Sequence, residues 1–133
     1  MGNFFDLSLH EMAEVGDLPA IQRYVERGGN VNKRDFYSNT ALHRAACMGY
    51  TSIAAYLIEA GAEIDAQAKD GWTPLHLACR WGRVPAARVL VDHGAATDAR
   101  TNDGRTPGEL IKVELLEKDR NELVRILDYK PNQ

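Results

Sequence analysis

Three of the four histidines recur at a fixed interval of 33 residues, and a cysteine closely follows two of them. The histidines are His10, His43 and His76, and the cysteines are Cys47 and Cys79. On a helix, spacings of three and four place an imidazole and a thiolate on one face, where they could bind zinc. A metal site needs ligands that converge on one point, whereas these pairs are spread along the chain. We therefore predict a structural role for the histidines, and neither a metal nor another cofactor.

Residues for catalysis are scarce. The serines are Ser8, Ser38 and Ser52, and none lies in a Gly-x-Ser-x-Gly motif. The chain also has no phosphate-binding glycine-rich loop and no His-Glu-x-x-His motif. The acidic pair Glu63 and Asp65 follows a predicted helix, at a position where acidic residues commonly form turns. The sequence therefore predicts no enzymatic activity.

The histidines belong to a longer repeated motif, Thr-x-Leu-His. It occurs as Thr40–His43 and Thr73–His76, and a degraded copy occupies Thr106–Glu109. The threonine hydroxyl and the imidazole can satisfy each other and nearby backbone groups where a loop enters a helix. A period of 33 residues is typical of stacked helical repeats, in which a unit buries its apolar face only against its neighbours.

Each regular unit contains two short predicted helices. The first helices cover residues 42–48 and 75–81, and the second helices cover residues 53–59 and 84–92. A glycine follows each first helix, as a left-handed helix end requires. Residues 9–15 and 20–25 align with these helices as a first unit with a polar outer face. We expect Cys79 to be buried and Cys47 to face outward.

Alignment by this period divides the chain into four units within a single domain, residues 1–133. Their approximate bounds are 1–34, 35–67, 68–100 and 101–130. In the last unit, the apolar residues near Leu123 align with earlier second helices only if about four residues are inserted around Leu115 to Lys118. Since four residues are close to one helical turn, we predict a lengthened C-terminal cap. The same alignment places Val113 and Glu114 on its first helix.

The repeated segments resemble the ankyrin-repeat family over residues 7 to 127. Asp70–Ala78 matches the family pattern at nearly every position, and Asp103–Pro107 is a second good match. The segment Phe36–Ala41 departs from it, with Ser38 where glycine is usual. The first unit is similar to small four-repeat members. The resemblance implies an all-α solenoid of helix-turn-helix units with hairpin-like loops, a groove that binds other proteins, and no intrinsic catalysis.

Candidate binding residues lie at positions that the family leaves variable. Aromatic residues, methionine and arginine are enriched at the centres of protein interfaces, and both tryptophans are among these positions. The predicted partner-binding residues are Arg34, Phe36, Tyr37, Asn39, Met48, Lys69, Asp70, Trp72, Arg80, Trp81 and Arg105. We expect Trp81 to lie near Met48 and Glu114, with Trp72 beside it. The alternative is that the tryptophans cover edges of the core.

Composition limits the class of partner. The net charge is −3, and the basic residues form no continuous stripe, which argues against nucleic acid. Basic residues nevertheless outnumber acids on the predicted binding face, so we expect another protein with a segment of acidic and apolar residues. No apolar stretch approaches the roughly 20 residues of a membrane span. Two cysteines indicate a reducing compartment. We expect a cytoplasmic monomer, with the nucleus open as a second location.

The sequence thus favours a protein–protein interaction module that acts as an adaptor, a scaffold or a regulatory subunit. The alternative left open is a dedicated inhibitor of an enzyme or of an actin-capping-type protein. An adaptor needs two independent binding surfaces, whereas an inhibitor needs one.

Overall fold

The computed structural model describes residues 7–128, and every regular element in that range is helical. In chain order the α-helices are α1 (Leu9–Val15), α2 (Leu18–Glu26), α3 (Ala41–Met48), α4 (Thr51–Glu59), α5 (Pro74–Arg80), α6 (Val84–Asp92) and α7 (Glu117–Asp128). Two short 3₁₀-helices, η1 (Lys69–Gly71) and η2 (Pro107–Leu110), lie in or after loops. The predicted all-helical architecture is confirmed. The outer ends of the predicted first and last units, residues 1–6 and 129–130, lie outside the described residues.

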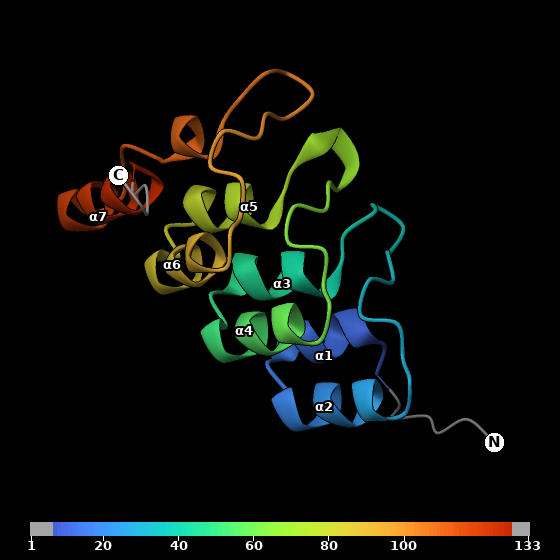
Figure 1. Cartoon of the computed structure of the whole chain (residues 1–133). Helices are drawn as coiled ribbons and strands as arrows, with labels where there is room; N and C mark the ends of the chain where they lie inside the picture. The colour runs from blue at the N-terminus through green and yellow to red at the C-terminus, as the bar shows by residue number, and fades with distance from the viewer. Residues whose placement is uncertain (1–6, 129–133) are drawn as a thin grey trace.

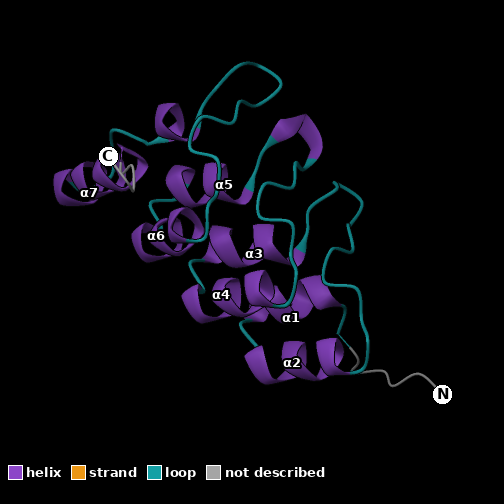
Figure 2. Ribbon diagram, viewed as in Figure 1, coloured by secondary structure: helices purple, strands orange, loops and turns teal. Residues whose placement is uncertain are grey.

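The helices form two layers in a progressive stack. The first helices α1, α3 and α5 pack side by side, and α4, α6 and α7 succeed one another in the second layer. The loops between units stand off on one side of the stack (Figure 1). Figure 2 shows that these loops are long and contain little helix. Within residues 7–128, no helix combines the length and apolar character needed to cross a bilayer.

Hydroxyl residues fix where the first helices begin. Thr40 Oγ1 accepts the backbone N–H of His43 at 3.3 Å, and Thr73 Oγ1 accepts that of His76 at the same distance. These bonds satisfy amide groups that have no partner inside the helix. At the other end of α3, Gly49 adopts the left-handed conformation, with φ 78°. Both signals were readable in the sequence, and both limit the first helices to about two turns.

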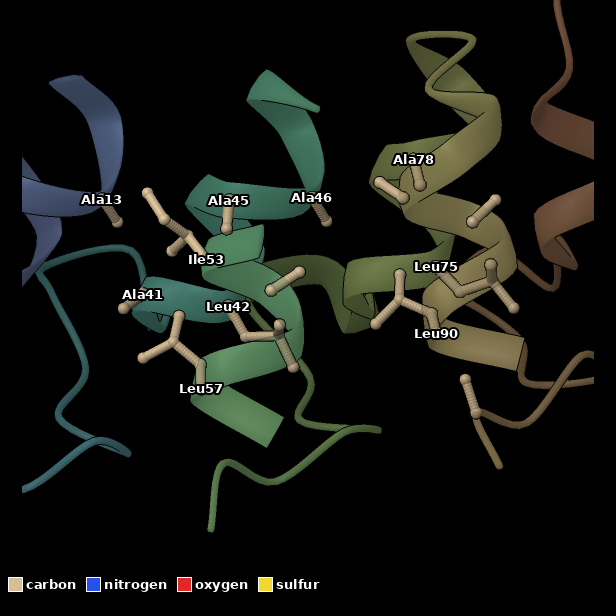
Figure 3. Close-up of a cluster of buried hydrophobic side chains, with 14 of the residues drawn as sticks. Ala13, Ala41, Leu42, Ala45, Ala46, Ile53, Leu57, Leu75, Ala78 and Leu90 are labelled. Atoms are coloured by element: carbon tan, nitrogen blue, oxygen red, sulfur yellow. The ribbon is translucent and has the colours of Figure 1, made fainter. Parts of the chain in front are cut away.

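Small side chains allow the layers to approach closely. Ala13, Ala46 and Ala78 are fully buried where successive first helices meet, as Figure 3 shows. Leucines such as Leu42 and Leu75 fill the space between the first and second helices of their units. Because the corresponding alanines and leucines of successive units pack against one another, one apolar core runs through the whole stack.

The recurring histidines connect neighbouring units. Each donates its Nε2–H to the backbone carbonyl of the residue 29 positions later, at the base of the next hairpin loop. The pairs are His10 with Asn39 (2.8 Å), His43 with Trp72 (2.9 Å) and His76 with Arg105 (2.9 Å). These bonds give the histidines the structural role predicted from the sequence.

The first hairpin loop contains a conformational exception. Ser38 has φ 63°, whereas the equivalent positions of the next two loops are Gly71 and Gly104, with φ of 83° and 86°. A β-carbon disfavours this region. Asp35 compensates, because its Oδ1 accepts the N–H groups of Tyr37 at 2.8 Å and of Asn39 at 2.9 Å. Side-chain hydrogen bonds therefore hold a loop that glycine would form without strain.

Ser38→Gly should accordingly stabilise the chain by about 1 kcal/mol, because the relief of strain exceeds the added entropy of the unfolded state. Urea unfolding followed by circular dichroism measures this difference. Ser52→Gly is the matched control, because Ser52 is exposed in α4 and the same change there should lower stability. Two losses of equal size would contradict the argument.

The last unit differs from the prediction. Its first helix is reduced to η2, residues 111–116 contain no helix, and α7 begins at Glu117. The expectation that Val113 and Glu114 lie on a first helix is therefore wrong. Glu109 caps η2 through Thr106, and the chain becomes extended at Ile111, with φ −66° and ψ 121°. Arg120 then binds the carbonyl groups of Val113 and Leu115. Of residues 115–118, the first two lie in the linker and the last two begin α7, which has 12 residues where α4 and α6 have 9.

Candidate functional site

Backbone hydrogen bonds hold the hairpin loops beside one another. The N–H of Lys69 donates to the carbonyl of Tyr37 at 3.0 Å, and the N–H of Asn102 donates to that of Asp70 at 2.9 Å. The loops therefore repeat with the same spacing as the helices below them. Side chains at equivalent loop positions are presented next to each other.

Six predicted residues form what we call the tip cluster. It consists of Phe36, Tyr37, Asn39, Lys69, Asp70 and Trp72. All except Phe36 line one open depression of about 240 Å³, together with Ala68 and with Leu77 of α5. Sequence reasoning missed Leu77, because its motif position suggests a purely internal leucine. The structure thus brings two loops and one helix together around a partly apolar hollow.

The aromatic residues of the tip cluster are oriented by different means. Phe36 is 91% exposed and contacts Tyr37 edge to face, with ring centroids 5.2 Å apart. Trp72 is half-buried, and its ring lies 6.1 Å from that of His76. Because the Trp72 carbonyl also accepts the bond from His43, its backbone position is set by the stack itself. The cluster therefore combines one firmly positioned ring with two exposed ones.

A second exposed feature lies at the ends of the first helices. Val15 ends α1, Met48 ends α3 and Trp81 follows α5, at positions 33 residues apart. Their exposed fractions are 62%, 38% and 48%. We call these three residues the helix-end row. Leu77 lies on α5, and Trp81 follows four residues later as the residue that caps this helix, so the two lie on the same side of it. We call the row and the tip cluster together the binding face, because the sequence predicts that a partner binds there.

The expected neighbours of Trp81 need correction. Trp72 precedes α5 and Trp81 follows it, so the two tryptophans lie at opposite ends of that helix and not beside each other. The side chain of Lys112 lies over the Trp81 ring, with Nζ 4.7 Å from the centroid. Leu115 fixes the linker of residues 111–116 by packing tightly on Gly82. A β-carbon added to Gly82 would lie only 2.8 Å from the Leu115 side chain. Alignment by period could not find Lys112, because this unit lacks its first helix.

Some of the predicted basic binding residues already form hydrogen bonds or ion pairs within the chain, and others do not. Arg34 donates to the carbonyls of Ser38 at 2.9 Å and Gln67 at 2.7 Å, which ties two loops together. Arg105 pairs with Asp103 at 3.3 Å. Within the described part of the chain, neither Lys69 nor Arg80 forms an ion pair. The positive charge available to a partner therefore comes from Lys69, Arg80 and the added Lys112.

The histidines and cysteines are not arranged for chemistry. Among the described residues, no group of three or more His, Cys, Asp or Glu side chains could hold a metal ion. Burial lowers the pKa of His43 to about 4, although its bond to the Trp72 carbonyl acts in the opposite direction. Burial raises the pKa of Cys79 to about 12 and also raises that of the half-buried Cys47. Neither thiol is therefore activated as a nucleophile.

Comparison with known proteins agrees with this geometry. No curated protein matches the chain. A family model described as ankyrin repeats, in three copies, matches residues 9–103, which include the first three helix pairs and the start of the fourth unit. This match covers more than half of the sequence, and the chain therefore belongs to the ankyrin-repeat family.

Proposed function

We propose that the chain binds a segment of another protein on the binding face and acts as an adaptor, a scaffold or a regulatory subunit, without catalysis of its own. The observation that carries this proposal is the clustering of exposed apolar side chains at the loop tips and helix ends. Ankyrin repeats are generally protein-interaction modules and are typically not enzymes. Exposed aromatic side chains that are already positioned lose little entropy on binding.

Charge specifies the partner further. Lys69 and Arg80 on the binding face, and Lys112 beside Trp81, favour a segment that carries acidic residues next to its apolar anchors. The net charge of −3 supports a protein partner over nucleic acid. We further propose a monomer located in the cytoplasm, with the nucleus as a second site. The two free cysteines support a reducing compartment.

Trp81→Ala is the direct test. Because Trp81 is 48% exposed and its removal leaves no core cavity, Trp81→Ala should lower stability by only about 1 kcal/mol. Binding should weaken about 30-fold or more, the effect of a central interface residue. The partner is first identified by affinity capture from native cells and mass spectrometry, and the dissociation constant is then measured by calorimetry.

Val124→Ala is the matched control for this test, because Val124 is 50% exposed but lies on α7, outside the binding face. It should leave affinity unchanged. If Trp81→Ala lowered the melting temperature strongly and left affinity unchanged, Trp81 would be a packing residue. The proposal that Trp81 is the main contact of the partner would then be wrong.

The second candidate is a dedicated inhibitor of an enzyme or of an actin-capping-type protein. It is favoured by the first helix pair, where Gly16–Val25 is similar to the opening of myotrophin, a small four-repeat member of the family. An inhibitor would bind one partner through the binding face. If the chain held two partners at once in a sequential pull-down, the adaptor function would be supported instead.

A further inference from the structure

We propose that the partner segment on the helix-end row is an amphipathic α-helix whose apolar anchors are seven residues apart. The inference rests on the proposed function and specifies the partner's conformation and orientation. It depends on the spacing, the hydrogen bonding and the charges of the row.

The spacing of the row matches a helix that crosses the stack. Val15, Met48 and Trp81 occupy equivalent positions on three helices that pack side by side. Packed helices lie roughly 8–10 Å apart, so neighbouring anchors of the row are separated by about that distance. Seven residues of an α-helix advance about 10.5 Å and return to nearly the same face. A helix of about 15 residues can therefore place one apolar side chain on each member of the row.

An extended strand does not match this spacing. Its side chains return to the same face every two residues, or about 6.6 Å. This repeat is shorter than the roughly 8–10 Å between neighbouring residues of the row. A polyproline II segment advances about 9.3 Å per turn and does match. Spacing thus leaves two candidate conformations, and hydrogen bonding distinguishes them.

The backbone N–H groups at the ends of the first helices are already bonded. Those of Gly16 and Asp17 donate to the Met12 carbonyl at the end of α1. At the ends of the other two first helices, the N–H groups of Gly49, Tyr50, Gly82 and Arg83 donate to the carbonyls of Ala46, Ala45, Cys79 and Ala78. A polyproline II segment needs external donors for its carbonyls, whereas an α-helix satisfies its own backbone. The row therefore favours a helix.

Charges around the row set the direction of that helix. Arg80 and Lys112 lie near Trp81 at one end, and they outnumber the exposed Glu114 of the same linker. At the other end, Glu14 precedes Val15 and pairs only loosely with Arg44, at 3.9 Å. The C-terminus of a helix carries partial negative charge and its N-terminus partial positive charge. The partner helix should thus end over Trp81, with an acidic residue there, and begin over Val15.

The test uses the full chain and a display library of random 21-residue peptides, so that no conformation is imposed on the binder. Enriched peptides should share apolar residues seven apart and an acidic residue near the C-terminal anchor. Synthesised peptides should gain helical circular dichroism on binding. Trp81→Ala and Lys112→Glu should each weaken binding about tenfold or more. A control peptide of the same composition, with its middle anchor moved by two positions, should bind at least about tenfold more weakly.

The outcomes separate this inference from the proposed function. Enriched peptides that need Trp81 but show a period of two or three, or gain no helix, would overturn the helix and leave the binding face intact. Binding that is unaffected by Trp81→Ala, Trp72→Ala and Phe36→Ala would overturn the binding face itself. A selection without enrichment would count against the helix, and the cellular partner measured with Trp81→Ala then decides whether the proposed function stands.

Discussion

Acidification from pH 6.5 to about 4 should lower the free energy of unfolding by about 3 kcal/mol through His43 alone. His43 is fully buried and neutral. Its Nε2–H donates to the Trp72 carbonyl, so Nδ1 must be the acceptor, and it accepts the Thr40 N–H at 3.1 Å. Protonation would place a second N–H against that amide, inside the core. Between pH 6.5 and about 4, His43 is therefore protonated in the unfolded state but stays mostly neutral in the folded state.

The sign of the effect follows from the direction of the shift. The folded pKa of His43 lies below the unfolded value, so its stabilising contribution is complete above pH 6.5 and is lost as the pH falls towards 4. Burial also lowers the pKa of His76, which adds to the loss with the same sign. Burial opposes the ionisation of Asp35, but hydrogen bonds from the Arg44 side chain and from the Asn39 and Tyr37 N–H groups together hold its pKa below the usual value. Its contribution is therefore lost at lower pH, outside this window.

Urea unfolding at several pH values measures how the free energy of unfolding depends on pH, and one variant assigns this dependence to His43. His43→Gln should unfold more readily at neutral pH but lose much of the pH dependence, since glutamine does not titrate. An equal slope in wild type and His43→Gln would show that the buried imidazole is not responsible.

Leu123→Ala should destabilise the chain by about 3 kcal/mol, because it leaves a cavity in a fully buried site. Leu123 is part of the common apolar core and belongs to α7, which packs on α6. Glu122 reinforces the contact by pairing with Arg88 across the two helices. Since α7 is the last helix of the stack, loosening it should expose the apolar side of α6, including Leu90, and promote aggregation.

Val124→Ala provides the comparison within the same helix. It removes an apolar side chain that is half exposed, and it should cost about 0.5 kcal/mol or less. Thermal unfolding combined with light scattering reports stability and aggregation together. If the two variants behaved alike, α7 would not close the core, and the predicted cap function of the last unit would be wrong.

The regular units could be predicted from the sequence because their local signals and their packing agree. The threonines that begin α3 and α5, and the glycines beside their ends, specify short helices without tertiary information. The alanines and leucines of the core then recur with the helices that carry them. Each histidine that connects two units was recognisable as structural, because a repeated motif describes a junction and not a single site.

Prediction failed where residues no longer follow the period. After Pro107, Gly108 and Glu109 replace Leu-His, so the junction bond is lost and only a short 3₁₀-helix forms. The position of the linker then depends on Leu115 against Gly82 and on Arg120, which are tertiary contacts. For this reason the position of Lys112 over the Trp81 ring could not be predicted from the period. The separation of the two tryptophans follows from the length of α5, which a comparison of equivalent positions between units does not contain.

The histidine bonds have a consequence for how such a chain can change in length. Every histidine bond spans the same 29 residues and joins an imidazole Nε2 to a backbone carbonyl oxygen. The bond therefore does not depend on which side chains the following unit carries. Duplication of residues 41–73 would give each new imidazole a carbonyl in register and would lengthen the helix-end row by roughly 8–10 Å. Glu109 stands where the histidines would be, and its carboxylate has no N–H to donate to a further carbonyl, so a unit added after the fourth would lack this bond. Genetic insertion and deletion can therefore act in whole units among those that carry the histidine.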